Sequence, residues 1–281
     1  MPFFGVAIVC GDDPNVREVL RHYRRRALTY GFDARNQIVA STPSFDGLRT
    51  RFEVRYLDEP VQAVELNLPG RHNVQNALAA YAVGREVGVR IDTIREALAT
   101  FGGVGRRFEI RSEADGVLHV DDYGHHPTEI AAVLATARQV WKRRLVTLFQ
   151  PHRYTRTRAL QAEFGRVLRD TDLLLLAEIY PAGERALPGV SSSLILAAIR
   201  AHADPPEILQ VANADEAARV AADLLQNGDV LLTLGAGDVH RWGDRIMAER
   251  ARRASTTPPS PLSRHSGGFD LDAIGRAKDC R

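Results

Sequence analysis

Two charged segments in the middle of the chain carry the side chains best suited to chemistry. The first runs from Asp121 to Glu129 (DDYGHHPTE) and the second from Gln150 to Arg158 (QPHRYTRTR). The first segment offers carboxylates, a phenol and two imidazoles, which suit a cation or a ribose. The second offers an imidazole and three guanidinium groups, which suit a carboxylate or a phosphate. The pair therefore predicts a site with one side for a cation or ribose and another for an anion.

A purely structural role for these side chains is the less favoured reading. A lone histidine is usually structural, but here three histidines, two aspartates and three arginines gather in two short segments. Burying such groups without partners is costly, so a ligand site at the surface is favoured. A dedicated zinc site is not predicted, because the adjacent His125 and His126 would point apart on an extended backbone.

The flanking residues predict how these two segments are positioned. Each follows a short apolar run that is typical of a buried strand, at residues 117–120 and 145–149, and each leads into a helical pattern. The carboxyl ends of parallel strands meet at one edge of a sheet, where α/β folds bind ligands. The predicted elements alternate regularly: strands 117–122, 145–150, 173–179, 207–211 and 229–234, with helices 127–140, 157–169, 191–202 and 214–226. This order predicts a doubly wound, mostly parallel, Rossmann-like α/β domain.

The first hundred residues differ from this pattern, and the glycines at 102–105 mark the predicted domain boundary. Before them we expect an α/β domain at 1–103, which looks incomplete because few strands and helices are available. Its predicted strands are 5–10, 37–40, 50–56 and 61–66, and its later helices are 74–87 and 91–101. The second domain is predicted at 104–248, and the Arg-, Ser- and Pro-rich tail at 249–281 is predicted to be disordered.

Composition excludes several classes of protein. The 281 residues allow about two domains, and 44% hydrophobic content is ample for their cores. No apolar stretch is long enough to span a bilayer and no signal-peptide pattern is present, so we expect a cytoplasmic protein without a membrane partner. The net charge of +2 comes without a basic stripe that contains interleaved aromatics, so no nucleic-acid partner is expected.

Two further segments have both a structural and a functional reading. LPGRHNVQN, from Leu68 to Asn76, precedes a helix for which Asn73 is the predicted N-cap. It is either a capped helix start or a place where an anion or a purine edge binds. GVGRRF, from Gly103 to Phe108, holds an arginine pair that is either an ordinary surface feature or a phosphate contact made when the domains close.

These motifs together resemble a known family. LPGRHNVQNALAA, GVGRRF, DDYGHHPTE, FQPHRYTRTR, YPAGE, PGVSS and GAGD, in this order and spacing, are similar to the Mur ligases of peptidoglycan synthesis, most closely to their alanine-adding members. The resemblance covers roughly residues 3–247. It implies that 1–103 is the rear part of a central ATP-binding domain and that 104–248 is the C-terminal domain that brings the amino acid.

The resemblance also implies a reaction. ATP phosphorylates the carboxylate of UDP-N-acetylmuramate to an acyl phosphate, and the amine of L-alanine attacks it through a tetrahedral intermediate, releasing ADP and phosphate. The implied cofactors are ATP and magnesium, and the implied small-molecule partners are L-alanine and UDP-N-acetylmuramate. Association with other cell-wall enzymes is a further expectation.

Roles of individual residues follow from the resemblance alone. His72, Asn73 and Asn76 match the adenine side, Asp122 the ribose ligand, and Arg107 the arginine that faces the phosphates, with Arg106 assisting. The family's residues that hold L-alanine and the acyl phosphate are matched by Tyr123, His125, His152, Arg153 and Arg156. Arg107, His125, Arg153 and Arg156 are the predicted catalytic residues, and no metal ligand is predicted.

One departure from the family pattern concerns the phosphate-binding loop. The family's glycine-rich loop ends in Lys and Thr, but the only lysines here are Lys142 and Lys278, and neither follows a glycine. We therefore expect the rear part of a longer ligase, truncated at its front, which alone holds neither ATP nor the uridine nucleotide well. The alternatives are a non-catalytic remnant or binding module, or a related muropeptide ligase.

Overall fold

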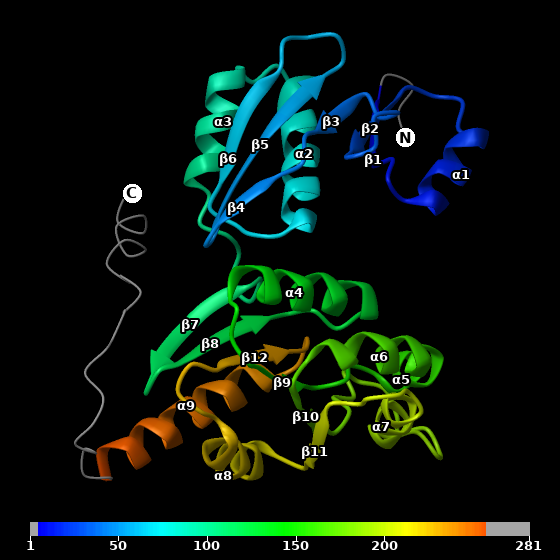
Figure 1. Cartoon of the computed structure of the whole chain (residues 1–281). Coiled ribbons are helices and arrows are strands. Elements are labelled where there is room, and N and C mark those ends of the chain that lie inside the picture. The colour runs from blue at the N-terminus through cyan, green and yellow to red at the C-terminus, as the bar shows by residue number, and fades with distance from the viewer. Residues whose placement is uncertain (1–4, 257–281) are drawn as a thin grey trace. The chain divides into compact units, whose positions relative to one another are not determined.

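The computed structural model describes residues 5–256, which form two compact α/β units (Figure 1). The division falls between Gly103 and Val104, so unit 1 comprises residues 5–103 and unit 2 residues 104–256 of the described chain. Each unit has its own sheet and its own hydrophobic core.

Unit 1 is built on a six-stranded mixed sheet. Its strands are β1 (Ala7–Cys10), β2 (Ala27–Gly31), β3 (Ile38–Ala40), β4 (Ser44–Asp46), β5 (Arg49–Tyr56) and β6 (Gln62–Leu66). The order is β1-β2-β3-β5-β4, with β6 also paired to β5; the first three strands are parallel and the remaining pairings are antiparallel. Its helices are α1 (Pro14–His22), α2 (Arg71–Glu86) and α3 (Ile91–Thr100).

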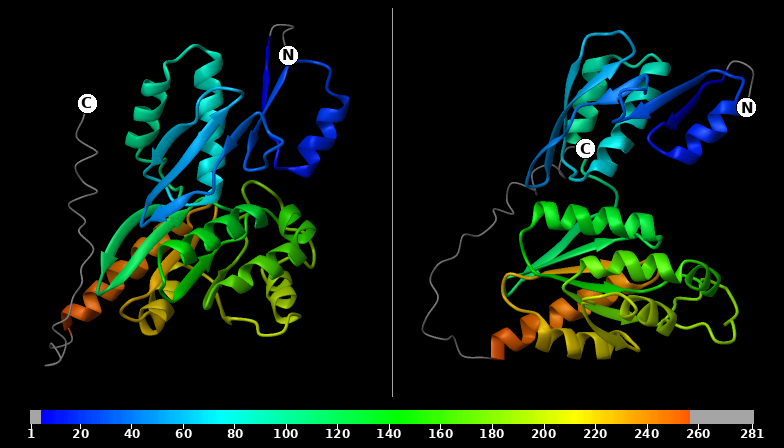
Figure 2. Two further views of the ribbon diagram at one scale, coloured as in Figure 1. Left: turned by 45° about the horizontal axis from the view of Figure 1, so that its top comes forward. Right: turned by 45° about the vertical axis from the view of Figure 1, so that its right-hand side comes forward.

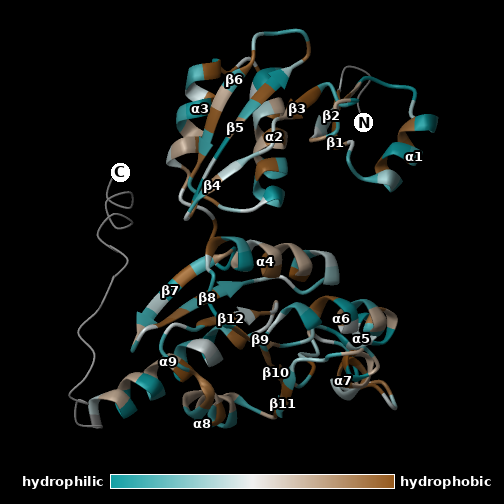
Figure 3. Cartoon of the chain, viewed as in Figure 1, coloured by the Kyte–Doolittle hydropathy of each residue, from teal (hydrophilic) through white to brown (hydrophobic). Residues whose placement is uncertain are grey.

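The core of unit 1 lies between this sheet and helices α2 and α3. Strand β5 alternates exposed and buried residues, as a half-buried strand does, and Phe52, Val54 and Tyr56 point inward. Val74 and Leu78 of α2 are fully buried against them. Figure 3 shows that α2 and α3 mix hydrophilic and hydrophobic residues, as expected of helices with one buried face.

The start of α2 differs from the prediction. The helix begins at Arg71, ahead of the predicted Val74, and its N-cap is Gly70, which has a φ of 99° and makes no side-chain cap. The prediction that Asn73 is the N-cap is therefore wrong, because the left-handed turn at Gly70 starts the helix earlier. The Asn73 side chain instead donates from Nδ2 to the carbonyl of Pro69 at 2.7 Å.

Unit 2 is built on a second six-stranded sheet, in the order β11-β10-β9-β12-β8-β7. All its strands are parallel except the edge strand β7, which forms a bulged antiparallel hairpin with β8. The strands are β7 (Glu109–Ala114), β8 (Val117–Asp122), β9 (Leu145–Phe149), β10 (Leu173–Ala177), β11 (Glu207–Val211) and β12 (Val230–Leu234). The predicted α/β class with a mostly parallel sheet is confirmed.

Helices cover both faces of this sheet (Figures 1 and 2). On one face α8 (Ala214–Leu224) and α9 (Val239–Thr256) pack against buried residues such as Val146 and Leu148. On the other face lie α4 (Pro127–Val140) and α6 (Gln161–Val167), where the rings of Phe149 and Phe164 are 5.5 Å apart. The remaining helices are α5 (Tyr154–Ala159), a 3-10 turn η1 (Leu168–Asp170) and α7 (Ser193–Arg200).

Two helix predictions in unit 2 need correction. The single helix expected at 157–169 is divided at Leu160, whose φ of −117° and ψ of 20° interrupt it, and its first part starts already at Tyr154. Helix α9 continues to Thr256, so the disorder expected from Glu249 onward is wrong for residues 249–256. There, Arg252 and Arg253 donate to the Glu249 carboxylate one turn away. The rest of that predicted tail lies outside the described residues.

Within residues 5–256, no helix is both long enough and apolar enough to cross a membrane.

Candidate functional site

The two charged segments meet at the carboxyl edge of the unit 2 sheet. Strands β8 and β9 lie on either side of β12, and all three are parallel, so their ends face the same way. Beyond those ends the rings of His125 and His152 approach to 5.2 Å between centroids. The prediction that both loops lie at one sheet edge is confirmed.

Four rings form a continuous row along this edge, which we call the aromatic row. Tyr123 and His125 are 5.3 Å apart and nearly perpendicular, and His125 and His152 follow at 5.2 Å. The fourth ring is Tyr180, which stacks on His152 at 5.8 Å with 12° between the planes. Tyr180 was not among the predicted site residues. It follows strand β10 at the same edge, which is the signal in the sequence that could have identified it.

The His125 imidazole is uncharged and has a defined tautomer. Its Nδ1 lies 3.0 Å from the carbonyl oxygen of Tyr123, and because a carbonyl only accepts, Nδ1 carries the proton. Burial lowers the pKa of His125, and the positive charges of Arg156 and Arg107 lower it further. The lone pair of Nε2 is therefore free to accept a proton.

His152 is also held in its uncharged form. Burial is the largest cause that lowers its pKa, followed by His125, Arg156 and Arg153. Its Nδ1 lies 3.5 Å from Nη1 of Arg156, near the upper limit of a hydrogen bond. Because arginine stays protonated in proteins, the site combines neutral imidazoles with permanent positive charge, which suits an anionic ligand.

Arg153 is positioned by a strained backbone. Its φ is 72°, in the left-handed region that non-glycine residues rarely adopt. Three hydrogen bonds hold it there: its N–H donates to the carbonyl of Tyr180 at 2.9 Å, and its carbonyl accepts from Oγ1 of Thr157 at 2.9 Å and from the N–H of Thr157 at 3.1 Å. Such strain is typical of functional sites.

Arg106 and Arg107 have different surroundings although they are adjacent. Arg107 is exposed, with its guanidinium 5.3 Å from the Tyr123 ring. Arg106 donates from Nε to Asp121 at 3.0 Å, and from its two terminal nitrogens to the carbonyls of Gly237 at 3.0 Å and Gly235 at 2.7 Å. Arg106 therefore fastens residues 235–238, which we call the glycine turn, to strand β8. Its predicted part in nucleotide binding stays a prediction.

Asp122 is buried at the end of β8 and joined to the backbone around it. Its carboxylate accepts from the N–H of Phe108 at 2.8 Å and of Gly124 at 2.7 Å. Burial raises the pKa of Asp122 to about 6, although these two bonds and Arg107 act in the opposite direction. In this arrangement Asp122 ties the backbone at Phe108 to the sheet edge, and its predicted ribose contact stays a prediction.

The predicted adenine-side residues belong to unit 1. His72 and Asn73 are half-buried in the first turn of α2, and Asn76 is exposed on the next turn. The structure therefore groups the predicted amino-acid residues in unit 2 with Arg107, but places the three adenine-side residues in the other unit. No group of three or more His, Cys, Asp and Glu side chains among residues 5–256 is arranged to hold a metal ion.

Comparison with known protein families gives two matches. A family model described as "Mur ligase middle domain" matches residues 1–84, and one described as "Mur ligase, glutamate ligase domain" matches residues 106–237. The second match covers the strands and loops that form the aromatic row.

Individual proteins agree with these matches. The UDP-N-acetylmuramate–L-alanine ligase of Geotalea daltonii is 41% identical over 254 residues, covering 90% of this chain and 55% of that protein. The enzyme of the same name from Nitratidesulfovibrio vulgaris is 49% identical over 249 residues, covering 88% and 54%. The solved structure of the UDP-N-acetylmuramate-alanine ligase from Thermotoga maritima is 27% identical with a TM-score of 0.67, covering 82% of this chain and 48% of that one. The chain thus spans about half the length of the curated relatives it matches.

Proposed function

This chain belongs to the Mur ligase family, and on that premise we propose that it is the amino-acid-adding part of an ATP-dependent ligase that joins L-alanine to the carboxylate of UDP-N-acetylmuramate. The observation that carries the proposal is the aromatic row, in which two uncharged imidazoles lie beside fixed guanidinium groups. We place the reaction in the cytoplasm.

In the proposed reaction the imidazole of His125 accepts the first proton that the alanine nitrogen must lose. Alanine enters as an ammonium ion, and only the neutral amine can attack. In the proposed step the amine nitrogen forms a bond to the acyl carbon, the bond from that carbon to the phosphate oxygen breaks, and phosphate leaves with the electron pair. The nitrogen loses two protons: the first, from the ammonium ion, goes to Nε2 of His125, whose lone pair is free because Nδ1 donates to the carbonyl of Tyr123, and the second leaves with the phosphate as hydrogen phosphate when the tetrahedral intermediate collapses.

In the proposed site the guanidinium groups bind the negatively charged groups of the substrates and of the intermediate. Arg153 and Arg156 lie near His152 at the sheet edge. Their positive charges suit the alanine carboxylate and the negative charge that develops on the tetrahedral intermediate. Arg107, exposed beside Tyr123, suits the transferred phosphate. His72, Asn73, Asn76 and Asp122 remain the proposed contacts to ATP, and binding of ATP and magnesium is proposed to need further residues that this chain does not contain.

The open edge of unit 1 supports the idea that further Mur ligase sequence packs here. Among the described residues β1 has a neighbour on one side alone, and its residues are all partly exposed. Ala7 donates to the carbonyl of Arg26, just before β2, and Gly11 to that of Tyr30 in β2, so by alternation the N–H and C=O groups of Ile8 face the open side. Helix α1 is amphipathic, yet none of its residues is buried. Such an edge suits an added parallel strand.

The test is reconstitution with the part of the Geotalea daltonii relative that lies outside the matched region. This part and the present chain would be mixed, or joined in one polypeptide, and ADP release measured with ATP, UDP-N-acetylmuramate and L-alanine. We expect ADP release that requires both substrates and both parts. Ile8→Pro, which removes an outward N–H, should weaken assembly of the mixed parts, whereas Ile8→Val should assemble normally.

A non-catalytic binding module is the second candidate function, and the same open edge favours it. The reconstitution separates the two candidates. A complex that forms but releases no ADP with any combination of substrates would support the binding module. A joined polypeptide that binds ATP yet shows no alanine-dependent turnover would refute the ligase proposal.

A further inference from the structure

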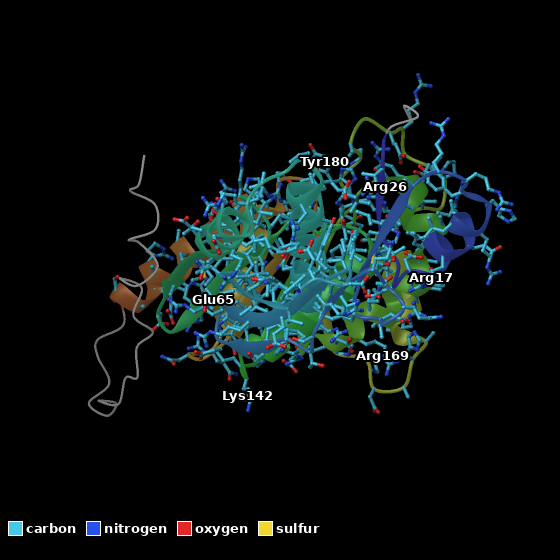
Figure 4. The ribbon with its side chains drawn as sticks, turned by 90° about the horizontal axis from the view of Figure 1, so that it is seen from above. Arg17, Arg26, Glu65, Lys142, Arg169 and Tyr180 are labelled. Atoms are coloured by element: carbon cyan, nitrogen blue, oxygen red, sulfur yellow. The ribbon has the colours of Figure 1, made fainter. Side chains whose placement is uncertain are left out.

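Tyr180 closes one end of the aromatic row and contacts His152 and both of its neighbours in the chain. Its ring stacks on the imidazole at 5.8 Å with 12° between the planes. Its N–H donates to the carbonyl of Pro151 at 2.8 Å, and its carbonyl accepts from the N–H of Arg153 at 2.9 Å. The backbone on either side of His152 is therefore tied to Tyr180, which is labelled in Figure 4.

The other neighbour of the Tyr180 ring is the glycine turn. A Cβ atom placed on Gly237 would lie 2.7 Å from Cγ of Tyr180, closer than such atoms approach in proteins. The ring is thus packed between His152 and a turn that only glycine can form at this distance. Arg106 donates hydrogen bonds to the carbonyls of Gly235 and Gly237, so the turn against which the Tyr180 ring packs is itself held in place.

Titratable groups approach His152 from the segments that follow three strands. His125 lies in the loop after β8, Arg153 in the loop after β9, Arg156 in helix α5, and Glu184 in the loop after β10. Three of these four groups oppose a positive charge on His152, and Glu184 favours one. The Tyr180 ring covers one face of the imidazole and keeps water away from it, which also opposes the charged form.

We propose that Tyr180 is a positioning residue of the amino-acid site, which holds the His152 ring against His125. The proposal rests on the proposed function, because that function makes the aromatic row the amino-acid site. Tyr180 is 38% exposed, so it lies at the surface of the site rather than in the core and can be replaced without opening a large cavity.

The experiment is an NMR titration of His152 in the present chain with labelled histidine. Tyr180→Leu removes the stacked ring, and Tyr180→Phe retains it. We expect the pKa of His152 to rise toward its ordinary value in Tyr180→Leu and to stay unchanged in Tyr180→Phe. Gly237→Ala places a Cβ atom 2.7 Å from the Tyr180 ring and 2.3 Å from Oε1 of Gln150, so it should disturb the packing of the ring and shift the His152 resonances in the same direction as Tyr180→Leu does. A His152 titration curve in Tyr180→Leu identical to that of the unmodified chain would overturn the proposal.

Adding L-alanine to the same samples separates this proposal from the proposed function. We expect L-alanine to shift the resonances of His125 and His152, with half-saturation at a roughly two- to tenfold higher concentration in Tyr180→Leu than in Tyr180→Phe. Equal half-saturation in both variants would overturn the positioning role. If L-alanine shifts nothing in any sample, the alanine site is wrong, and the His152 titration alone then decides whether Tyr180 positions the ring.

Discussion

Replacing Arg106 by alanine should destabilise unit 2 far more than the same change at Arg107. The Arg106 side chain is 22% exposed and pairs with Asp121, which is fully buried. Without Arg106, the Asp121 carboxylate keeps its hydrogen bond from the hydroxyl of Thr233 at 2.6 Å, but its charge loses the cation paired with it. Breaking a buried ion pair by removing one member costs about 3–5 kcal/mol.

The adjacent Arg107 is the matched control. It is exposed, and a surface substitution of this kind changes the free energy of unfolding by no more than about 0.5 kcal/mol. Urea unfolding of both alanine variants, followed by circular dichroism, measures the difference. Asp121→Asn in the Arg106→Ala background should recover part of the loss, because the two residues interact and an uncharged amide is less costly to bury.

Two outcomes would refute this reasoning. If Arg106→Ala unfolds at the same urea concentration as the unmodified chain, the guanidinium does not stabilise the buried Asp121. If the two alanine variants are equally stable but Arg106→Ala alone loses ADP release in the reconstituted ligase, Arg106 contacts the phosphates and the structural role is wrong.

The remaining predictions concern pH and the amino-acid site. Burial lowers the pKa of His119 to about 4, so the folded state favours the neutral ring. The resulting contribution to stability is complete above the ordinary pKa of about 6.5 and is lost as the pH falls toward 4. Over this range the free energy of unfolding should fall by about 3 kcal/mol. His119→Phe should remove this pH dependence from the free energy of unfolding, whereas Leu118→Ala should lower stability equally at every pH, and a parallel pH dependence in both would contradict the assignment. In the reconstituted ligase, Arg156→Ala should raise the KM for L-alanine roughly ten- to hundredfold, and the exposed Arg158→Ala should leave it unchanged; equal KM values would rule out the Arg156 contact.

Short apolar runs between polar segments made most of unit 2 predictable. Strand β8 and helix α4 have the predicted limits, because their patterns end sharply at Asp122 and Val140. Strand β4, with the sequence Ser-Phe-Asp, and strand β7, in which four of six residues are charged or polar, were not predicted. Both are held by pairing with a neighbouring strand, and pairing of this kind leaves little trace in local composition.

The site was predicted in part for a related reason. The motifs placed His125 and His152 on loops at one edge of a parallel sheet, and the rings do meet there. The motifs did not show that β12 lies between β8 and β9, which brings the glycine turn into the site, nor that Tyr180 reaches the row from a third loop. Strand order and ring stacking join residues far apart in the chain, so no local pattern contains them.

The sequence by itself determined the chemical groups that are present, the family of the chain and the edge of the sheet where those groups gather. Tertiary structure alone decided what each group does there. Arg106 and Arg107 are chemically identical neighbours, yet the side chain of Arg106 is hydrogen-bonded to Asp121 and the glycine turn, while that of Arg107 is exposed. Likewise, His125 and His126 are adjacent, but burial beside Arg156 keeps the first uncharged while the second caps helix α4. Residues from distant segments bury a side chain, place charges near it and form its hydrogen bonds, and these surroundings determine its protonation state and the groups that it can contact.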